Sequence, residues 1–282
     1  MNTYLTVDLE DFSHDLGRHL DLKPSIQPRI DALYEAYDEI NNLVKTCSNS
    51  KNSRITFFIT GVLAEKVPEL IAKIAMDGHE IACHYYHHEV MFSKNIKEVE
   101  YMLRKAIDKL EIASNTKILG FRAPYFKIDK IQSQQYHLIE KLFKYDSSLC
   151  INSKEKLNLF YKRMKLKTLK IFPVYSDKVC FIPLRTGGTF IKIFPTPFIK
   201  SLLRKNTKAG QNKIFYIHPY EFKGGENWRL SLKDLSSLPV MRRLYWMVRQ
   251  NQWLNFGNKT LNLKITKLLQ NTELSGPLKD LI

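Results

Sequence analysis

Residues 78–88 read Gly78-His79-Glu80-Ile81-Ala82-Cys83-His84-Tyr85-Tyr86-His87-His88. The apolar run at 80–82 predicts a short strand that ends just before a group of histidines. His84 and His88 are four residues apart, and on one helical turn such a pair lies on a single face. Two imidazoles held in this way can bind one divalent metal ion, and a third ligand would leave open positions for water and substrate. We interpret His79 as structural and His87 as a flanking or exposed residue.

Three carboxylates follow the first predicted strand, which covers residues 4–7. They are Asp8, Glu10 and Asp11. One interpretation is an N-cap cluster that begins the next turn. The other divides the acids by role, so that one binds the metal and another takes a proton from water. A general base cannot also be consumed as a ligand, so this second interpretation needs at least two acids.

Two further candidates follow strand-like runs. Arg122 ends the strand predicted over 118–122, where its guanidinium could fix the orientation and pKa of a catalytic carboxylate or simply precede a surface turn. His218 ends a late strand that begins at residue 213, and Pro219 would make the next turn rigid. A histidine in that place could be a general acid, or equally a buried histidine of the core.

Strands and helices alternate along the first half of the chain. Helices are predicted over 30–44, 67–76, 94–112 and 132–143, and strands over 55–60, 80–82 and 118–122. This alternation favours parallel βα units wound into a barrel or an open sheet, with the chemistry at the carboxyl ends of the strands. The pattern loosens from 152 to 170, a turn is predicted over 186–190, and the chain beyond 226 is basic and helical.

Composition bounds the class of protein. The chain has 282 residues, 44% of them hydrophobic and 26% charged, which is typical of a globular protein. We expect no transmembrane helix and no signal peptide. The four cysteines form no CxxC pair, so reduced thiols in the cytosol are expected. The net charge of +16 reflects either compositional bias or an anionic partner such as a phospholipid surface or a nucleotide-linked sugar. No nucleic-acid-binding signature is present, so nucleic acid is not an expected partner.

Taken together, these motifs resemble the polysaccharide deacetylases, the NodB-like family also known as carbohydrate esterase family 4. The resemblance is to the branch whose first motif is Val-Asp-x-Glu-Asp. It rests on residues 6–12, 78–84, 120–124, 145–148, 187–188 and 215–221. It implies an α/β fold, a distorted (β/α)7-type barrel. The resemblance covers roughly residues 3–225, so we expect a catalytic barrel over residues 1–225; beyond it we expect a basic helical C-terminal extension over 226–282, packed on the barrel.

The resemblance also implies roles for the candidate residues. His84 and His88 would bind the metal, Asp8 would be the general base, Arg122 would orient it, His218 would be the general acid, and the backbone around Tyr125 would help bind the oxyanion. The family's acidic ligand directly follows the base, but here that position is Leu9. The ligand is therefore Glu10 or Asp11, and both remain open. Zn²⁺ is the expected ion, and Co²⁺ or Mn²⁺ would also fit two histidines and a carboxylate.

The expected function is metal-dependent removal of the N-acetyl group of a sugar in cell-surface polysaccharide or lipopolysaccharide biosynthesis. The sugar could be nucleotide-linked, lipid-linked or polymeric. The expected location is the cytoplasm, with peripheral contact to an anionic inner membrane as an option. Two alternatives are a hydrolase of another C–N amide bond on the same fold and a non-catalytic glycan- or membrane-binding protein. The intact candidate set argues against the non-catalytic alternative.

Overall fold

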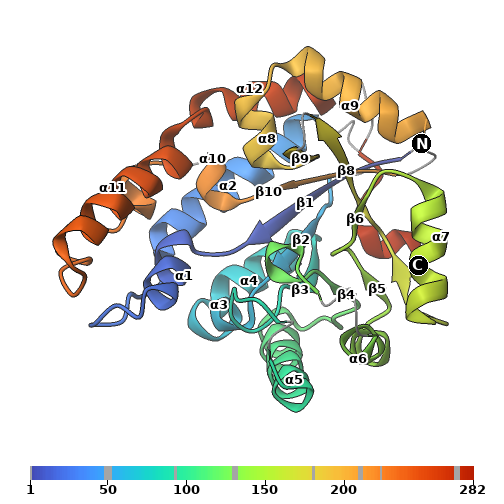
Figure 1. The fold of residues 1–282 in the computed structure, drawn as a ribbon, viewed down its shortest axis with the longest axis horizontal. Helices are drawn as coiled ribbons and strands as arrows, with labels where there is room; N and C mark the ends of the chain where they lie inside the picture. The colour runs from blue at the N-terminus through green and yellow to red at the C-terminus, as the bar shows by residue number, and fades with distance from the viewer. Residues whose placement is uncertain are drawn as a thin grey trace.

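A seven-stranded parallel sheet forms the centre of the computed structural model (Figure 1). The structure describes residues 2–47, 53–91, 94–128, 133–179, 182–208, 212–222, 224–269 and 274–282. The strand order is β10-β1-β2-β3-β4-β5-β7, and every neighbouring pair is parallel. The strands are β1 Thr3–Leu9, β2 Thr56–Ile59, β3 Glu80–Cys83, β4 Gly120–Phe121, β5 Tyr145–Asp146, β7 Lys170–Ile171 and β10 Lys213–Ile217. The sheet curls into an incomplete barrel with helices outside it, which confirms the predicted (β/α)7-type fold.

Helices connect these strands in sequence and cover the outside of the sheet (Figure 1). They are α1 Phe12–His19, α2 Ile30–Cys47, α3 Gly61–Lys66, α4 Pro68–Met76, α5 Ile96–Ser114, η1 Pro124–Phe126, α6 Gln134–Leu142, α7 Lys154–Met164, α8 Gly188–Ile193, α9 Thr196–Lys208, α10 Pro219–Phe222, η2 Glu226–Trp228, α11 Val240–Asn255, α12 Asn258–Leu269 and η3 Leu278–Leu281. None of the helices in the described ranges is long and apolar enough to cross a bilayer.

The helix α5 shows how local sequence sets these elements. Val99, Leu103 and Leu110 recur at helical spacing and are buried against the sheet. The side chain of Asn95 accepts a hydrogen bond from the backbone N–H of Lys97 and caps the first turn, and a left-handed Asn115 follows the last turn. The helix therefore begins and ends where its capping residues lie, close to the predicted range of 94–112.

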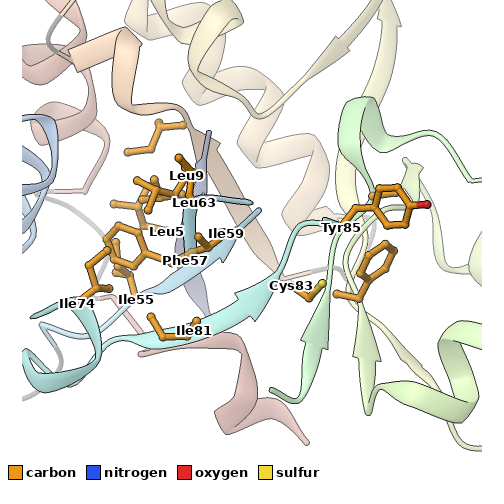
Figure 2. Packing of buried hydrophobic residues seen from close by; sticks show 14 of the residues in the cluster. Leu5, Leu9, Ile55, Phe57, Ile59, Leu63, Ile74, Ile81, Cys83 and Tyr85 are labelled. Carbon is orange, nitrogen blue, oxygen red and sulfur yellow. The ribbon is translucent and has the colours of Figure 1, made fainter. Parts of the chain in front are cut away.

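Side chains of the strands alternate between the two faces of the sheet, as the period of an extended chain requires. Leu5, Leu9 and Phe57 point to the helices, where Figure 2 shows them packed together. Tyr4 and Phe58 belong to a second buried cluster, which fills the inside of the curl. Because both faces of β1 and β2 are buried, β2 is almost entirely apolar, and the polar residues of β1, Thr3, Thr6 and Asp8, are buried as well.

A smaller sheet lies beside the free edge of β10. It consists of β6 Cys150–Ile151, β8 Val174–Val179 and β9 Ile182–Arg185, in the order β6-β8-β9. The backbone N–H of Tyr216 donates to the carbonyl of Thr186 at 3.1 Å, and Gly187 forms a parallel bridge with Tyr216. Residues that follow β9 therefore extend the wall of the barrel beyond β10.

The last residues of the chain cover the amino ends of the first strands. Leu274 bridges Thr3, the N–H of Leu278 donates to Oγ1 of Thr56 at 2.8 Å, and the N–H of Lys279 donates to Glu80. The amino end of the barrel is thereby covered. The domain boundary expected at residue 226 stays a prediction. Leu274, near the end of the expected C-terminal extension, pairs with Thr3 of β1.

Three local predictions were incomplete or wrong. The stretch 152–170 contains the regular helix α7, and of the turn predicted over 186–190 only residues 186–187 are non-helical, because α8 begins at Gly188. The loop predicted after residue 46 lies outside the described residues except for Cys47, the last residue of α2, and residue 132 of the predicted helix 132–143 also lies outside them. The thiols of Cys47 and Cys83 are free, while Cys180 lies outside the described part of the chain.

Candidate active site

Glu10, His84 and His88 form a compact group at the carboxyl end of the barrel. One ligand atom of each lies within 4.8 Å of the others. Nε2 of His88 is 2.5 Å from Oε2 of Glu10, and the rings of His84 and His88 have centroids 5.2 Å apart. All three side chains are nearly buried. The structure thus brings together the two predicted histidine ligands and one of the two candidate acids.

A loop rather than a helix positions the two histidines. The N–H of His84 continues the strand pairing by donating to the carbonyl of Ile59 at 2.9 Å. Tyr85 then adopts a left-handed backbone with φ 66°, and its carbonyl accepts from the N–H of Gly61 at 2.9 Å. The prediction of one helical face was therefore wrong. The rings still converge, because the left-handed residue turns the chain sharply after β3.

The group has the properties of a divalent-metal site. Nδ1 of His84 donates to the carbonyl of Arg122 at 2.7 Å, and burial lowers the pKa of His84 to about 4, so its Nε2 keeps a free lone pair. Oε2 of Glu10 is buried, and Nε2 of His88 lies 2.5 Å from it. A cation bound by both atoms would replace this ion pair with two ligand bonds. Two imidazoles and a carboxylate fit Zn²⁺ or a similar ion.

Charges within the group oppose the effect of burial. Burial raises the pKa of Glu10, but the neighbouring His88, His218 and His84 outweigh this and lower it to about 2. For His88, burial lowers the pKa, but the contact with Glu10 opposes this effect, and the pKa of His88 is raised overall. Glu10 is therefore a carboxylate at neutral pH, as a ligand must be.

Asp11 has a different place from Glu10. It is the N-cap of α1, and its Oδ1 accepts from the backbone N–H of His14 at 2.9 Å. Its Oδ2 accepts from the backbone N–H of Arg29 at 2.5 Å. Burial raises the pKa of this carboxyl to about 6. Both oxygens of Asp11 thus hold backbone, as the capping interpretation of the acid cluster expects, and only Glu10 of the two lies in the histidine group.

Asp8 and Arg122 form a buried ion pair beside this group. Nη1 of Arg122 donates to Oδ1 of Asp8 at 2.6 Å, with the two side chains 0% and 2% exposed. The same nitrogen donates to Oγ1 of Thr6 at 2.8 Å, and Nη2 donates to Oγ of Ser147 at 2.9 Å. The guanidinium also lies over the ring of Phe58 at 4.1 Å. Every side of the arginine is engaged, so Asp8 is held in one orientation.

His218 follows β10 and lies between two carboxylates. Its Nδ1 is 3.2 Å from Oε2 of Glu221, and its Nε2 is 3.8 Å from Oε1 of Glu10. Burial lowers the pKa of His218, but Glu221 and then Glu10 outweigh it and raise the pKa to about 9. The ring stacks on Tyr220 with an interplanar angle of 14°. His218 is therefore a fixed imidazolium at neutral pH, with Nε2 directed to the group of Glu10.

Glu221 was not among the candidates from the sequence. It is fully buried, its Oε1 accepts from the hydroxyl of Thr189 at 2.9 Å, and its Oε2 accepts from the backbone N–H of His218 at 2.9 Å. Gly188 allows this approach, because a Cβ there would lie 1.7 Å from Oε2. The sequence His218-Pro219-Tyr220-Glu221 could have indicated this role, because it places a glutamate three residues after a histidine at the end of a strand.

Tyr125 lies in a strained turn that borders the group. Tyr125 and Phe126 have φ of 57° and 59°, which is unusual for residues other than glycine. The ring of Tyr125 lies 4.4 Å from that of His88, and the backbone is fixed at Ala123, whose N–H donates to Oγ of Ser148 at 2.7 Å. Tyr125 therefore borders the group of Glu10, His84 and His88, and the predicted role of its backbone in binding the oxyanion stays a prediction.

A cavity of about 1040 Å³ opens from this group to the surface. Glu10, His88 and Tyr125 line its floor, and Trp246 and Trp253 of α11 are among its walls. This volume is large enough for a small ligand.

The other two histidines near the motif lie elsewhere. His79 is a structural residue, as predicted, that accepts from the N–H of Ile55, and His87 packs on Tyr86 outside the group of ligands.

Comparisons with known proteins match two segments of this chain. The family model "Polysaccharide deacetylase" matches residues 31–139, and "Domain of unknown function (DUF3473)" matches residues 152–272. A peptidoglycan deacetylase of Helicobacter pylori is 30% identical over 97 residues, which are 34% of this chain and 32% of that protein. A peptidoglycan deacetylase-like protein of Gibberella zeae is 35% identical over 97 residues, 34% of this chain and 28% of its own length. The matched part thus spans about a third of these relatives.

The fold has a counterpart among solved structures. A protein of Mycobacterium smegmatis described as a polysaccharide deacetylase aligns with 100% of this chain and 90% of its own, with a TM-score of 0.57 and 18% sequence identity. At that identity the likeness concerns the fold alone. Residues 31–139 of this chain therefore match the polysaccharide deacetylase family, and the fold and the convergence of the motif residues agree with that match.

Proposed function

We propose that this protein hydrolyses the N-acetyl group of an N-acetylated sugar, with a divalent metal ion bound by Glu10, His84 and His88. The observation that carries the proposal is the convergence of this group with the Asp8–Arg122 pair and with His218 at one end of the barrel. The names of the two relatives, a peptidoglycan deacetylase and a peptidoglycan deacetylase-like protein, support an N-acetylated sugar as the substrate class.

The metal ion would supply Lewis-acid chemistry, which polarises a carbonyl and lowers the pKa of a bound water. Asp8 would take the proton of the attacking water. Its Oδ1 is held by Arg122, and we assign Oδ2 as the atom that receives the proton. Because Glu10 and not Asp8 lies among the ligands, the base stays available for this transfer.

His218 would act at the other side of the scissile bond. Its pKa is raised to about 9, so its imidazole carries a proton at neutral pH. Nδ1 faces Glu221, which leaves Nε2 to donate to the nitrogen of the sugar as the C–N bond breaks. Water adds to the carbonyl carbon, the amine leaves with the proton of His218, and acetate is the second product. The backbone N–H of Tyr125 is our candidate donor to the oxyanion.

Metal analysis of the purified protein tests the proposal. We expect about one divalent ion per chain in the wild type and its loss in His84→Ala/His88→Ala and in Glu10→Gln. Asp11→Asn is the matched control, because it changes the neighbouring carboxylate without removing a ligand, and it should keep the ion. A wild type that takes up no ion after reconstitution with Zn²⁺, Co²⁺ or Mn²⁺ would contradict the proposal.

Acetate release then tests the chemistry. Soluble N-acetylglucosamine oligomers, a nucleotide-linked N-acetyl sugar and a lipid-linked N-acetyl sugar should be compared as substrates. Asp8→Asn and His218→Gln should both abolish release while keeping the metal ion. If the metal-loaded wild type releases no acetate from any of these substrates but hydrolyses another amide, the protein is a hydrolase of a different C–N bond. If it hydrolyses nothing, the protein is a binding protein.

We further propose that the sugar belongs to cell-surface polysaccharide or lipopolysaccharide assembly and that the protein acts in the cytoplasm. The net charge of +16 supports an anionic carrier, either a nucleotide or a lipid-linked phosphate. The free thiols of Cys47 and Cys83 agree with a reducing compartment. Cell fractionation of the tagged protein would test the location, and recovery outside the cytoplasmic and inner-membrane fractions would contradict it.

A further inference from the structure

Helix α11 presents a stripe of apolar side chains to solvent. Val240, Met241, Leu244, Tyr245 and Val248 are all more than half exposed, with Met241 the most exposed at 78%. Their spacing places them on one face over two helical turns. A contiguous exposed apolar face of this kind marks an interaction surface rather than a scatter of single residues. We call these five residues the α11 stripe.

The opposite face of α11 is well packed, so the stripe is not a poorly placed core. Trp246 and Met247 pack on a buried leucine cluster that includes Leu16 and Leu230. The side chain of Gln250 accepts from the N–H of Leu230 and donates to its carbonyl, both at 2.8 Å. These contacts fix the rotation of the helix and leave its apolar stripe outside. Figure 1 shows α11 at the edge of the molecule.

The charge around the stripe indicates an anionic partner. Residues 240–269, which cover α11 and α12, contain no aspartate or glutamate. Their basic residues are Arg242, Arg243, Arg249, Lys259, Lys264 and Lys267. On the helix, Arg242 and Arg249 lie on one side of the stripe and Arg243 lies on the other. An apolar face that includes a tyrosine and is bordered by arginines is typical of helices that lie in a membrane interface.

A second copy of the chain fits this face less well. If two copies met through the stripe, Arg242, Arg243 and Arg249 of one would approach the same residues of the other. No acidic residue of α11 is available to compensate them. Like charges brought together in an interface oppose association. An anionic lipid surface satisfies both the apolar stripe and its arginine border.

The stripe is also joined to the candidate active site. Trp246, Arg249 and Trp253 of the same helix line the cavity that contains Glu10 and His88. We propose that the α11 stripe docks the protein on an anionic lipid bilayer and so places the mouth of this cavity at the membrane surface, toward a lipid-linked N-acetylated sugar. The docking stands on the helix alone, and the choice of sugar rests on the proposed function.

Co-sedimentation with vesicles tests the docking. The wild type should bind vesicles that contain phosphatidylglycerol better than vesicles of phosphatidylcholine alone, and added salt should weaken the binding. Met241→Gln/Leu244→Gln/Val248→Gln should lower the partition coefficient at least about tenfold, because three apolar side chains no longer enter the lipid. The matched control is Met76→Gln/Ile112→Gln/Leu159→Gln, which changes equally exposed apolar residues on α4, α5 and α7 and should bind like the wild type.

Three results would overturn the docking. They are a wild type that does not bind anionic vesicles, a stripe variant that binds like the control variant, and a wild-type dimer in sedimentation velocity that the stripe variant abolishes. Acetate release from a soluble N-acetylglucosamine oligomer is measured separately, and the stripe variant should match the wild type there. Its release from a lipid-linked N-acetyl sugar in vesicles should fall. Vesicle binding without any acetate release would refute the proposed function but not the docking.

Discussion

Replacing Arg122 by methionine would remove the cation at the centre of the barrel while keeping most of its volume. The guanidinium is 0% exposed and donates hydrogen bonds to Asp8 at 2.6 Å, to Thr6 at 2.8 Å and to two oxygens of Ser147 at 2.9 and 3.3 Å. Methionine makes none of these bonds. The principal consequence is that the carboxylate of Asp8 stays buried without its counter-charge.

The cost of that unpaired charge sets the expected magnitude. Removing one partner of a buried ion pair costs about 3–5 kcal/mol of unfolding free energy. For a chain of this size about 1 kcal/mol corresponds to roughly 2 °C in Tm, so Arg122→Met should lower Tm by about 6–10 °C. The double variant Asp8→Asn/Arg122→Met leaves no unpaired charge. It should therefore be more stable than the sum of the single changes predicts, by about 1–3 kcal/mol.

Calorimetric unfolding at neutral pH measures both values. Arg104→Met is the matched control, because Arg104 forms an exposed pair with Glu100 at 2.7 Å on α5 and should cost less than about 1 kcal/mol. Acetate release by Arg122→Met should fall by about 100-fold or more, since Asp8 loses its fixed orientation. The reasoning is refuted if Arg122→Met is as stable as Arg104→Met, or if the effects of Asp8→Asn and Arg122→Met simply add.

Three other substitutions test other parts of the structure. Burial lowers the pKa of His79 from 6.5 to about 4, so as pH falls between these values the unfolded chain binds a proton that the folded chain does not. The folded state therefore loses up to about 3 kcal/mol of stability over this pH range. In urea unfolding, His79→Gln should lose less stability than the wild type between pH 6.5 and 4. Asp11→Ala should lower stability by about 1–2 kcal/mol by removing the cap of α1 but should keep the metal ion. Loss of the ion from that variant would make Asp11 a ligand. Glu221→Gln should lower kcat at neutral pH with little change in Tm, because glutamine can still accept the N–H of His218 but cannot balance the charge of its imidazolium. A kcat equal to that of the wild type would show that the charge of Glu221 is not needed.

The core strands and long helices could be predicted from the sequence because their burial is simple. Both faces of β2 are buried, so its sequence is a continuous apolar run, and α5 has one regular apolar face. The pairs of residues that form β4, β5 and β7 are too short for any periodicity. Helix α7 was missed because it buries only Phe160 and Met164, so its apolar face is weak.

The choice between Glu10 and Asp11 could not be made from the motif, but it follows from the length of β1. The strand continues to Leu9, and alternate residues of an extended chain point to the same side. Asp8 and Glu10 therefore both point into the barrel, while Leu9 belongs to the buried cluster beneath the helices. Asp11 comes next, where the chain turns into α1, and its carboxylate caps that helix. A prediction that ended the strand at residue 7 could not show this alternation.

The histidine pair and Glu221 show two ways in which local backbone decides a site. Nothing in the spacing of His84 and His88 distinguishes a helical turn from a left-handed loop, so the two rings converge through a backbone that the spacing did not predict. At His218, the following Pro219 begins α10, and Glu221 returns to accept the N–H of His218 as in a capping box. The same carboxylate oxygen lies 3.2 Å from the imidazole. One helix-capping glutamate thus fixes the backbone that carries the histidine and supplies the charge that keeps its ring protonated, which explains how a helix of four residues can position the proposed general acid.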